Sequence, residues 1–252
     1  MLTRIIITLT VQGEAVPSVH WGSLLHGVLM QKLNPDYVDF LHGSGLKPLS
    51  QYVLPLNQAE GGKGLKWTVN LMGEDAVQEV LPVLQSIKEY YLEHKKTYLK
   101  VEEINVDKKV SEEEFCFKYL ADSEYLRYPP VKFLTPCSHK SGGQYSLFPS
   151  TELILKSLVQ KWNSYASLHA LQDEKALEQM IFFTRIQSYN LRSTKYYLES
   201  VRIPSYIGKL TLAVQGPDPL VRLINMLLYF AEYSGIGIKT SLGMGACVIS
   251  RP

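Results

Sequence analysis

The chain has 252 residues, 46% hydrophobic and 20% charged, which is enough to bury a core without disulfide or metal support. No stretch approaches the roughly 20 consecutive apolar residues of a membrane helix, and the N-terminus lacks the features of a secretion signal. The three cysteines, Cys116, Cys137 and Cys247, form neither a disulfide framework nor a paired zinc motif. We therefore expect a cytoplasmic protein without membrane contact, a bound metal or a cofactor.

The net charge of +2 hides an asymmetry between the two halves of the chain. Residues 1–124 contain 12 basic and 17 acidic residues, a net of −5, whereas residues 125–252 contain 14 basic and 7 acidic residues, a net of +7. Such a basic half predicts a polyanionic partner. Chance scatter of charge over two solvated surfaces is the alternative.

The first half alternates strand and helix patterns. It predicts strands at 2–11, 48–55, 65–72 and 97–106 and helices at 18–33 and 75–92. A short extra helix begins at Asn34-Pro35-Asp36, where Asn caps and Pro suits the first helical position, and ends at Gly43. The order is strand–helix–strand–strand–helix–strand.

The second half repeats this order after a predicted linker bracketed by Glu112–Glu114 and Tyr128-Pro129-Pro130. It predicts a strand at 132–135, a polar loop at 138–145, a helix over 150–171, a β-hairpin within 182–201, a strand at 209–215, a helix at 219–233 and a strand at 244–250. Two β-α-β-β-α-β modules in tandem are the α+β, ferredoxin-like (RRM-like) layout. We therefore predict domains at 1–124 and 125–252, on the order of elements alone.

The most specific segment is the glycine-rich run, residues 235–245. Glycine permits positive φ and close approach, and exposed N–H groups beside a lysine can hold phosphates. The run is neither a dinucleotide fingerprint nor a P-loop, because its glycine spacing and its helix-to-strand order differ. A purely structural loop is the alternative. Its candidate binding residues are Gly235, Gly237, Lys239, Ser241, Gly243 and Gly245.

This run, with the helix end at 231–234, resembles the C-terminal signature of the CRISPR repeat-processing endoribonucleases, the sixth Cas family. Other segments follow in that family's order over nearly the whole chain: Leu24-Leu25-His26-Gly27, Phe40-Leu41-His42, Thr135-Pro136, Phe148-Pro149-Ser150, Ile203-Pro204 and Gly208-Lys209-Leu210. The resemblance implies two ferredoxin-like domains, metal-independent cleavage within CRISPR repeat RNA, and an active site near a histidine of the first domain. Repeat RNA, as precursor and as mature guide, is then the partner. Whether the protein also binds other CRISPR effector subunits, and whether it is a monomer or a homodimer, stays open.

Two rival functions share the fold. A non-catalytic RNA-binding subunit of a CRISPR effector complex would have the same fold and glycine-rich run, but no need for two histidines on neighbouring helices. An acylphosphatase-like enzyme would need an arginine in its first turn, and Gly13–Ser18 contains none.

RNA cleavage without a metal uses the 2′-OH as nucleophile and leaves a 2′,3′-cyclic phosphate and a 5′-OH. It needs a base, an acid and a cation, and histidine suits the proton transfers. His42 ends a helix, where the dipole favours imidazolium, and it matches the family's catalytic histidine. His26 is either its acid–base partner or a half-buried structural histidine. Met30 stands where family members often carry tyrosine, which favours a two-histidine mechanism. Lys47 is either a stabiliser of the phosphorane or a solvated lysine.

Residues 182–203 interleave cations with Tyr189, Tyr196 and Tyr197, a pattern typical of surfaces that bind RNA phosphates and splayed bases. The tyrosines could equally be sheet core. His139 and Lys140 lie in the polar loop, which we expect to be a surface segment within reach of phosphate, and His169 is expected to be structural. We expect the second domain to hold the repeat while the first brings His42 to one phosphodiester. The candidate RNA-binding cations are Arg185, Arg192, Lys195, Arg202 and Lys140.

Overall fold

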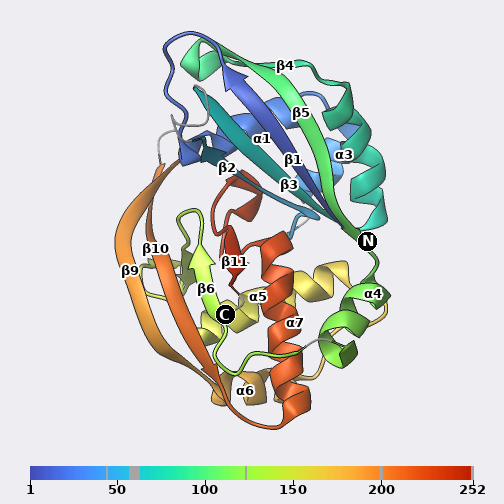
Figure 1. Ribbon diagram of the computed structural model, residues 1–252, viewed down its shortest axis with the longest axis vertical. Helices are drawn as coiled ribbons and strands as arrows, with labels where there is room; N and C mark the ends of the chain where they lie inside the picture. The colour runs from blue at the N-terminus through green and yellow to red at the C-terminus, as the bar shows by residue number, and fades with distance from the viewer. Residues whose placement is uncertain (44, 57–62, 123, 199–200, 251–252) are drawn as a thin grey trace. The chain divides into compact units, whose positions relative to one another are not determined.

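The structure is a computed structural model that describes residues 1–43, 45–56, 63–122, 124–198 and 201–250 (Figure 1). Its chain divides into two compact units. The first comprises Met1–Lys109 with Ser241–Gly243, and the second comprises Val110–Thr240 with Met244–Pro252. Each unit builds its own sheet and its own helices.

The first unit is built on a five-stranded sheet of order β2-β3-β1-β5-β4. β-branched residues dominate the central strand β1, which pairs antiparallel with β3 from Leu2 opposite Met72 to Thr10 opposite Gly64. The strands are β1 (Leu2–Val11), β2 (Leu49–Pro55), β3 (Gly64–Met72), β4 (Glu89–Leu92) and β5 (Thr97–Val110).

Three helices share one hydrophobic core with this sheet. They are α1 (Gly22–Met30), which follows the 3₁₀ turn η1 (Val19–Trp21), α2 (Pro35–Gly43) and α3 (Glu74–Ser86). Leu25 of α1, Leu41 of α2 and Val80 of α3 are all fully buried in the cluster that includes Ile5 and Ile7 of β1. Burial of one apolar stripe per helix therefore fixes each helix on the sheet.

The predicted helix over 75–92 was too long. α3 ends at Ser86, Ile87 is extended, and Glu89–Leu92 form β4, in which Tyr90 and Leu92 are buried and Glu89 and Tyr91 are exposed. This strict alternation has the period of a strand, and Tyr91 pairs with Tyr98 across β4 and β5. A 3₁₀ turn, η3 (Glu93–Lys95), separates the two strands.

The second unit is built on a four-stranded sheet of order β11-β6-β10-β9. Its strands are β6 (Pro130–Phe133), β9 (Thr184–Leu198), β10 (Val201–Val214) and β11 (Cys247–Ile249), and a separate small ladder joins β7 (His139–Ser141) to β8 (Gln144–Ser146). The helices and turns are α4 (Glu112–Phe117), the short π-helix η4 (Lys118–Asp122), α5 (Thr151–Tyr165), α6 (Glu174–Phe182), α7 (Asp218–Ser234) and the 3₁₀ turn η5 (Thr240–Leu242).

The two units share one topology. In the second unit the first strand, β6, lies between the last strand, β11, and the third, β10, with the second, β9, at the edge. In the first unit β1 likewise lies between β5 and β3, with β2 at the edge, and β4 is an addition beyond β5. The predicted tandem of ferredoxin-like β-α-β-β-α-β modules is confirmed.

The predicted hairpin within 182–201 was wrong in its bounds. Residues 184–198 form the single strand β9, whose antiparallel partner is β10, so the predicted strand at 209–215 is only the second part of β10. Pro204 and Gly208 lie inside β10 and broke its pattern in the sequence. The short helix α6 was not predicted; Asp173 caps it by accepting from the Lys175 N–H at 2.9 Å.

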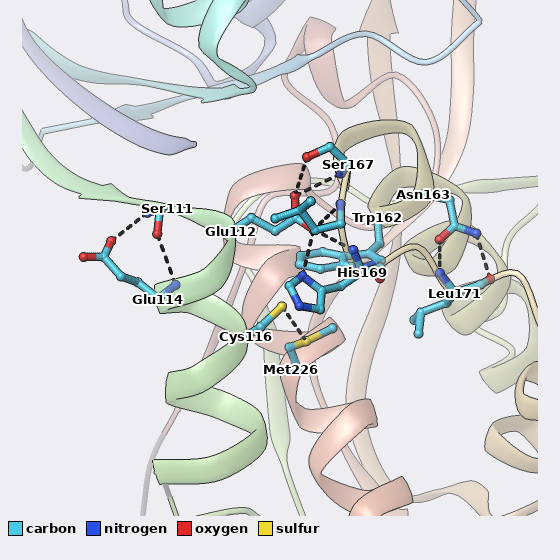
Figure 2. A network of polar contacts seen from close by, with 11 residues as sticks. Ser111, Glu112, Glu114, Cys116, Trp162, Asn163, Ser167, His169, Leu171 and Met226 are labelled. Atoms are coloured by element: carbon cyan, nitrogen blue, oxygen red, sulfur yellow. Dashed lines mark hydrogen bonds and ion pairs between the residues drawn. The ribbon is translucent and has the colours of Figure 1, made fainter.

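The acidic segment Glu112–Glu114, predicted to border the linker, begins helix α4 of the second unit. Ser111 and Glu114 form a capping box at its start. The Glu112 carboxylate accepts from the backbone N–H groups of Ser167 at 2.9 Å, Leu168 at 3.1 Å and His169 at 2.9 Å, as Figure 2 shows. The second unit therefore begins at Val110, whereas the sequence placed the boundary after residue 124.

The same network ends α5 earlier than predicted. The helix stops at Tyr165 rather than near Leu171, and His169 lies in the segment beyond it, with Nδ1 at 3.1 Å from Glu112 Oε1. Trp162 Nε1 donates to the His169 carbonyl at 2.8 Å (Figure 2). His169 thus joins α4 to the end of α5, the structural role expected of it.

Candidate active site and RNA interface

Helices α1 and α2 of the first unit bring His26, His42 and Lys47 together. His26 lies on α1, His42 in the last turn of α2, and Lys47 just before β2. Both Lys47 and His42 act electrostatically on the His26 ring. Lys47 Nζ donates to the carbonyl oxygen of Leu41, which keeps the ammonium at the end of α2. The three predicted catalytic residues therefore form one cluster.

The two histidines of this cluster differ in exposure. His42 is exposed, whereas His26 is half-buried and its Nδ1 has no hydrogen-bond partner among the described residues. Burial, with smaller contributions from Lys47 and His42, lowers the pKa of His26 to about 4. His26 is consequently neutral at pH 7 and can accept a proton.

The glycine-rich run is packed, and most of its glycines face protein. A Cβ on Gly237 would lie 2.2 Å from the carbonyl oxygen of Ser138, and one on Gly245 would lie 2.0 Å from that of Ile236. Gly235, Gly237 and Gly245 all have positive φ and use their N–H groups inside the fold, toward Ala231, Ser157 and Pro136 respectively. The expectation that these three N–H groups are free for phosphate was wrong.

The exposed part of the run is its middle. Lys239 is exposed and has a positive φ of 56°, and the turn η5 follows it. Ser241–Gly243 belong to the first unit, where Gln51 Nε2 donates to the Ser241 carbonyl at 3.0 Å and to the Gly22 carbonyl, at the start of α1, at 2.6 Å. Trp67 Nε1 donates to the side-chain oxygen of Gln51, Oε1, at 2.8 Å.

The cations of β9 and β10 are divided between the two faces of the sheet. Cys247 faces α7, since its Sγ contacts the Ala231 carbonyl, and its partner Phe133 shares that face. The alternation along each strand then puts Lys132 on the opposite face, directly across from Lys209. Arg192 pairs with Ile207, two residues before Lys209, and so lies on the face of Lys132 and Lys209.

We call the face of the sheet that is directed away from α7, and that carries Lys132, Arg192 and Lys209, the open face. Lys195 pairs with Pro204 and Arg202 with Tyr197, so these two cations lie on the other face of the sheet. Arg202 lies over the Tyr197 ring at 5.8 Å, and Tyr197 and Tyr189 are exposed, whereas Tyr196 is buried against Ile203 and Met244. Arg185 is exposed opposite Ala213, beyond a bulge.

Lys132 and Lys209 were missed as binding candidates. The four strands of this sheet contain six basic residues and no acidic one: Lys132, Arg185, Arg192, Lys195, Arg202 and Lys209. Like charges directly opposite on paired strands are destabilising, which argues for a functional reason to keep them. Their pairing could not be seen without the strand register, although the absence of acidic residues is visible in the sequence.

The polar loop at 138–145 is a small hairpin, and its histidine is not at the surface. His139 is 3% exposed, stacks on Tyr206, and its Nε2 lies 3.1 Å from the Tyr206 hydroxyl. Burial lowers the pKa of His139 to about 4. Lys140, the next residue, is exposed on β7, as its predicted role requires.

Comparison with known proteins identifies the family. A family model described as CRISPR-associated endoribonuclease Cas6 matches residues 131–247. A Cas6 endoribonuclease from Streptococcus thermophilus is 35% identical over 220 residues, 87% of each chain, and one from Mycobacterium tuberculosis is 29% identical over 97% of this chain and 77% of its own. The chain belongs to the Cas6 family.

The fold agrees with solved Cas6 structures. That of a Cas6 product complex superposes with a TM-score of 0.80 at 20% identity and covers 99% of this chain and 100% of its own. Among the described residues of this Cas6 family member, no helix is long and apolar enough to cross a membrane, and no three His, Cys, Asp or Glu side chains are grouped as metal ligands.

Proposed function

We propose that this Cas6 family endoribonuclease cleaves CRISPR precursor RNA within its repeats by attack of a 2′-OH on the adjacent phosphate, with His26 and His42 transferring the protons. The observation that supports this most directly is the cluster on α1 and α2. It combines a neutral histidine, an exposed histidine and an ammonium group within electrostatic reach of one another. The relatives that match most of the chain are named endoribonucleases, which favours cleavage over a non-catalytic RNA-binding role.

The different environments of the two histidines support a different role for each. His26, held neutral by burial, accepts the proton of the 2′-OH, and the approach of a phosphate anion raises its proton affinity. His42, exposed at the negative end of the α2 dipole, donates a proton to the leaving 5′-oxygen. Lys47 stabilises the additional negative charge of the phosphorane. The products are a 2′,3′-cyclic phosphate and a 5′-hydroxyl.

We propose that the RNA backbone is bound by the second unit. Three cations, Lys132, Arg192 and Lys209, lie on the open face, and Ile238 and Met244 of the glycine-rich run pack farther along the same face against Tyr196 and Ile203. Lys239 and Lys140 extend the basic surface, and Lys195, Arg202 and Arg185 are secondary contacts. Ser241 and Gly243 are grouped with the first unit, where Gln51 binds both the Ser241 carbonyl and the carbonyl of Gly22 at the start of α1.

The cytoplasm is the compartment that we propose. All three cysteines are buried thiols, and burial raises the pKa of Cys116 to about 11 and of Cys137 to about 12. A protein of this kind works with its thiols reduced.

The catalytic assignment is tested by replacing His42. His42→Ala should slow single-turnover cleavage of repeat RNA by about 10²–10⁴, the usual contribution of one acid or base. Its RNA affinity should change little, because phosphate contacts dominate such interfaces. His94→Ala is the matched control, since His94 is also an exposed histidine of the first unit. A near-wild-type rate for His42→Ala would remove His42 from the mechanism.

A further inference from the structure

Two polar side chains on one face of α5 hold the start of the glycine-rich run. Lys161 Nζ donates to the carbonyl oxygens of Ser234 at 3.3 Å and Gly235 at 2.9 Å. Ser157, one helical turn earlier, accepts through Oγ from the Gly237 N–H at 3.2 Å. Because residues four apart lie on the same side of a helix, α5 presents both groups to the run together.

The carbonyl groups bound by Lys161 belong to the end of α7. The last carbonyl groups of a helix have no partner within it, and the helix dipole favours a cation at that end. Gly235 has a positive φ of 66° and also accepts from the Ser234 hydroxyl at 3.0 Å. Lys161 therefore fixes the point at which α7 ends and the run begins.

The other side of the run is held by the backbone before β7. Ile238 N donates to the Ser138 carbonyl at 3.0 Å, and Gly245 N donates to the Pro136 carbonyl at 2.9 Å. These contacts involve main-chain atoms and cannot be removed by exchanging a side chain. The α5 side is thus where substitution can release the run without altering its own sequence.

Lys161 makes its two hydrogen bonds at an unusual cost. The residue is 8% exposed, and its charge is felt by the thiols of Cys137 and Cys247 and by His139. Burial lowers its pKa to about 8. A neutral donor would cap the same carbonyl groups without the desolvation penalty of a buried ammonium.

We propose that Lys161, assisted by Ser157, is a positioning residue for RNA recognition: it holds the glycine-rich run in the form that presents Lys239 to the RNA backbone. This rests on the proposed role of the run in RNA binding. Neither α5 side chain touches RNA. When the contacts are lost, only a fraction of molecules retains the competent run, and the apparent Kd rises by the inverse of that fraction. The rate of the bound complex is unchanged, since the histidines lie on α1 and α2.

The test compares Lys161→Met and Ser157→Ala with Lys156→Met. Lys156 is on the exposed side of the same helix, where its Nζ lies 2.6 Å from Glu152 Oε1. Affinity is measured with repeat RNA carrying a 2′-deoxy nucleotide at the cleavage position, and rate by single turnover at saturating RNA. We expect Lys161→Met to raise Kd about tenfold and Ser157→Ala about threefold, with rates at saturation within about twofold of wild type. Lys156→Met should match wild type in both.

Two results would overturn the inference. One is a folded Lys161→Met protein that binds RNA as tightly as Lys156→Met. The other is a fall in both RNA affinity and saturating rate in proportion to the loss of folded protein measured by circular dichroism. Such a result would indicate a general loss of structure. If Lys161→Met does not fold, Ser157→Ala decides by the same criteria.

Lys239→Met separates this inference from the proposal on which it rests. Unchanged RNA affinity of Lys239→Met would mean that the run is not part of the RNA surface, and both proposals would fail. Weakened binding by Lys239→Met together with normal binding by Lys161→Met would refute the positioning role alone.

Discussion

Replacing Lys132 and Lys209 by glutamine should weaken RNA binding while leaving the fold intact or more stable. The two lysines lie directly opposite each other on β6 and β10 and are both exposed on the open face. Like charges in this arrangement destabilise a sheet by roughly 0.2–1 kcal/mol. Their removal should therefore leave Tm unchanged or raise it by about 1–3 °C for a chain of this size.

The substitutions should also weaken the dependence of RNA affinity on salt concentration. If each lysine contacts one phosphate of a single strand, its loss lowers the slope of log K against log salt by about 0.7, and the pair lowers it by about 1.4. Between 50 and 200 mM salt, the affinity of the wild type should then fall by about sevenfold more than that of the variant. Fluorescence anisotropy with labelled repeat RNA over this range measures both slopes.

Two matched pairs serve as controls. Lys195→Gln with Arg202→Gln removes two cations from the other face of the same sheet, and Lys95→Gln with Lys96→Gln removes two exposed cations from the first unit. The account predicts a smaller change in slope for the first control and the smallest for the second. Equal slopes for all three pairs would show that the open face is not the RNA path.

Three further results are expected. Glu112→Gln should lower the free energy of unfolding by about 1–3 kcal/mol in urea titrations, because it weakens an acceptor that receives three backbone N–H groups (Figure 2). Glu113→Gln, at the exposed neighbouring position, should have almost no effect. Equal effects of the two substitutions would refute the anchoring role of α4. The pKa values of His26 and His139 fall from 6.5 to about 4 on folding, so below pH 6.5 the unfolded chain binds more protons than the folded one. The free energy of unfolding should therefore drop by about 2 kcal/mol per histidine between pH 7 and pH 5. His139→Gln should remove about half of that drop, and a wild-type drop in this variant would contradict the buried, neutral state of His139.

Local pattern predicted the elements whose stabilising contacts are periodic along the sequence. The β-branched run of β1 and the apolar stripe of α1 were read correctly because one buried face dictates each period. β10 was misread because Pro204 and Gly208 break the pattern, although the pairing with β9 tolerates both. β4 was merged into α3 because four residues are too few to show a period of two against a preceding helix.

The sequence suggested the residues of the candidate site but not their arrangement. Family motifs led to His26, His42, Lys47 and the glycine-rich run. The burial that separates the roles of the two histidines, however, arises from packing between α1, α2 and the sheet. The division of Arg192 and Lys195 between opposite faces follows from strand pairing, and the contacts of Lys161 join residues more than 70 positions apart. None of these relations is local in the chain.

We propose that histidines of the first unit activate the RNA's own 2′-OH. The most direct measurement is single-turnover cleavage of repeat RNA in millimolar EDTA, beside the same RNA carrying one 2′-deoxy nucleotide on the 5′ side of the mapped cleavage position. We expect EDTA to leave the rate unchanged, the products to carry a 2′,3′-cyclic phosphate and a 5′-hydroxyl, and the deoxy substrate to be bound but not cut. Cleavage of the deoxy substrate at that position would refute the 2′-OH mechanism.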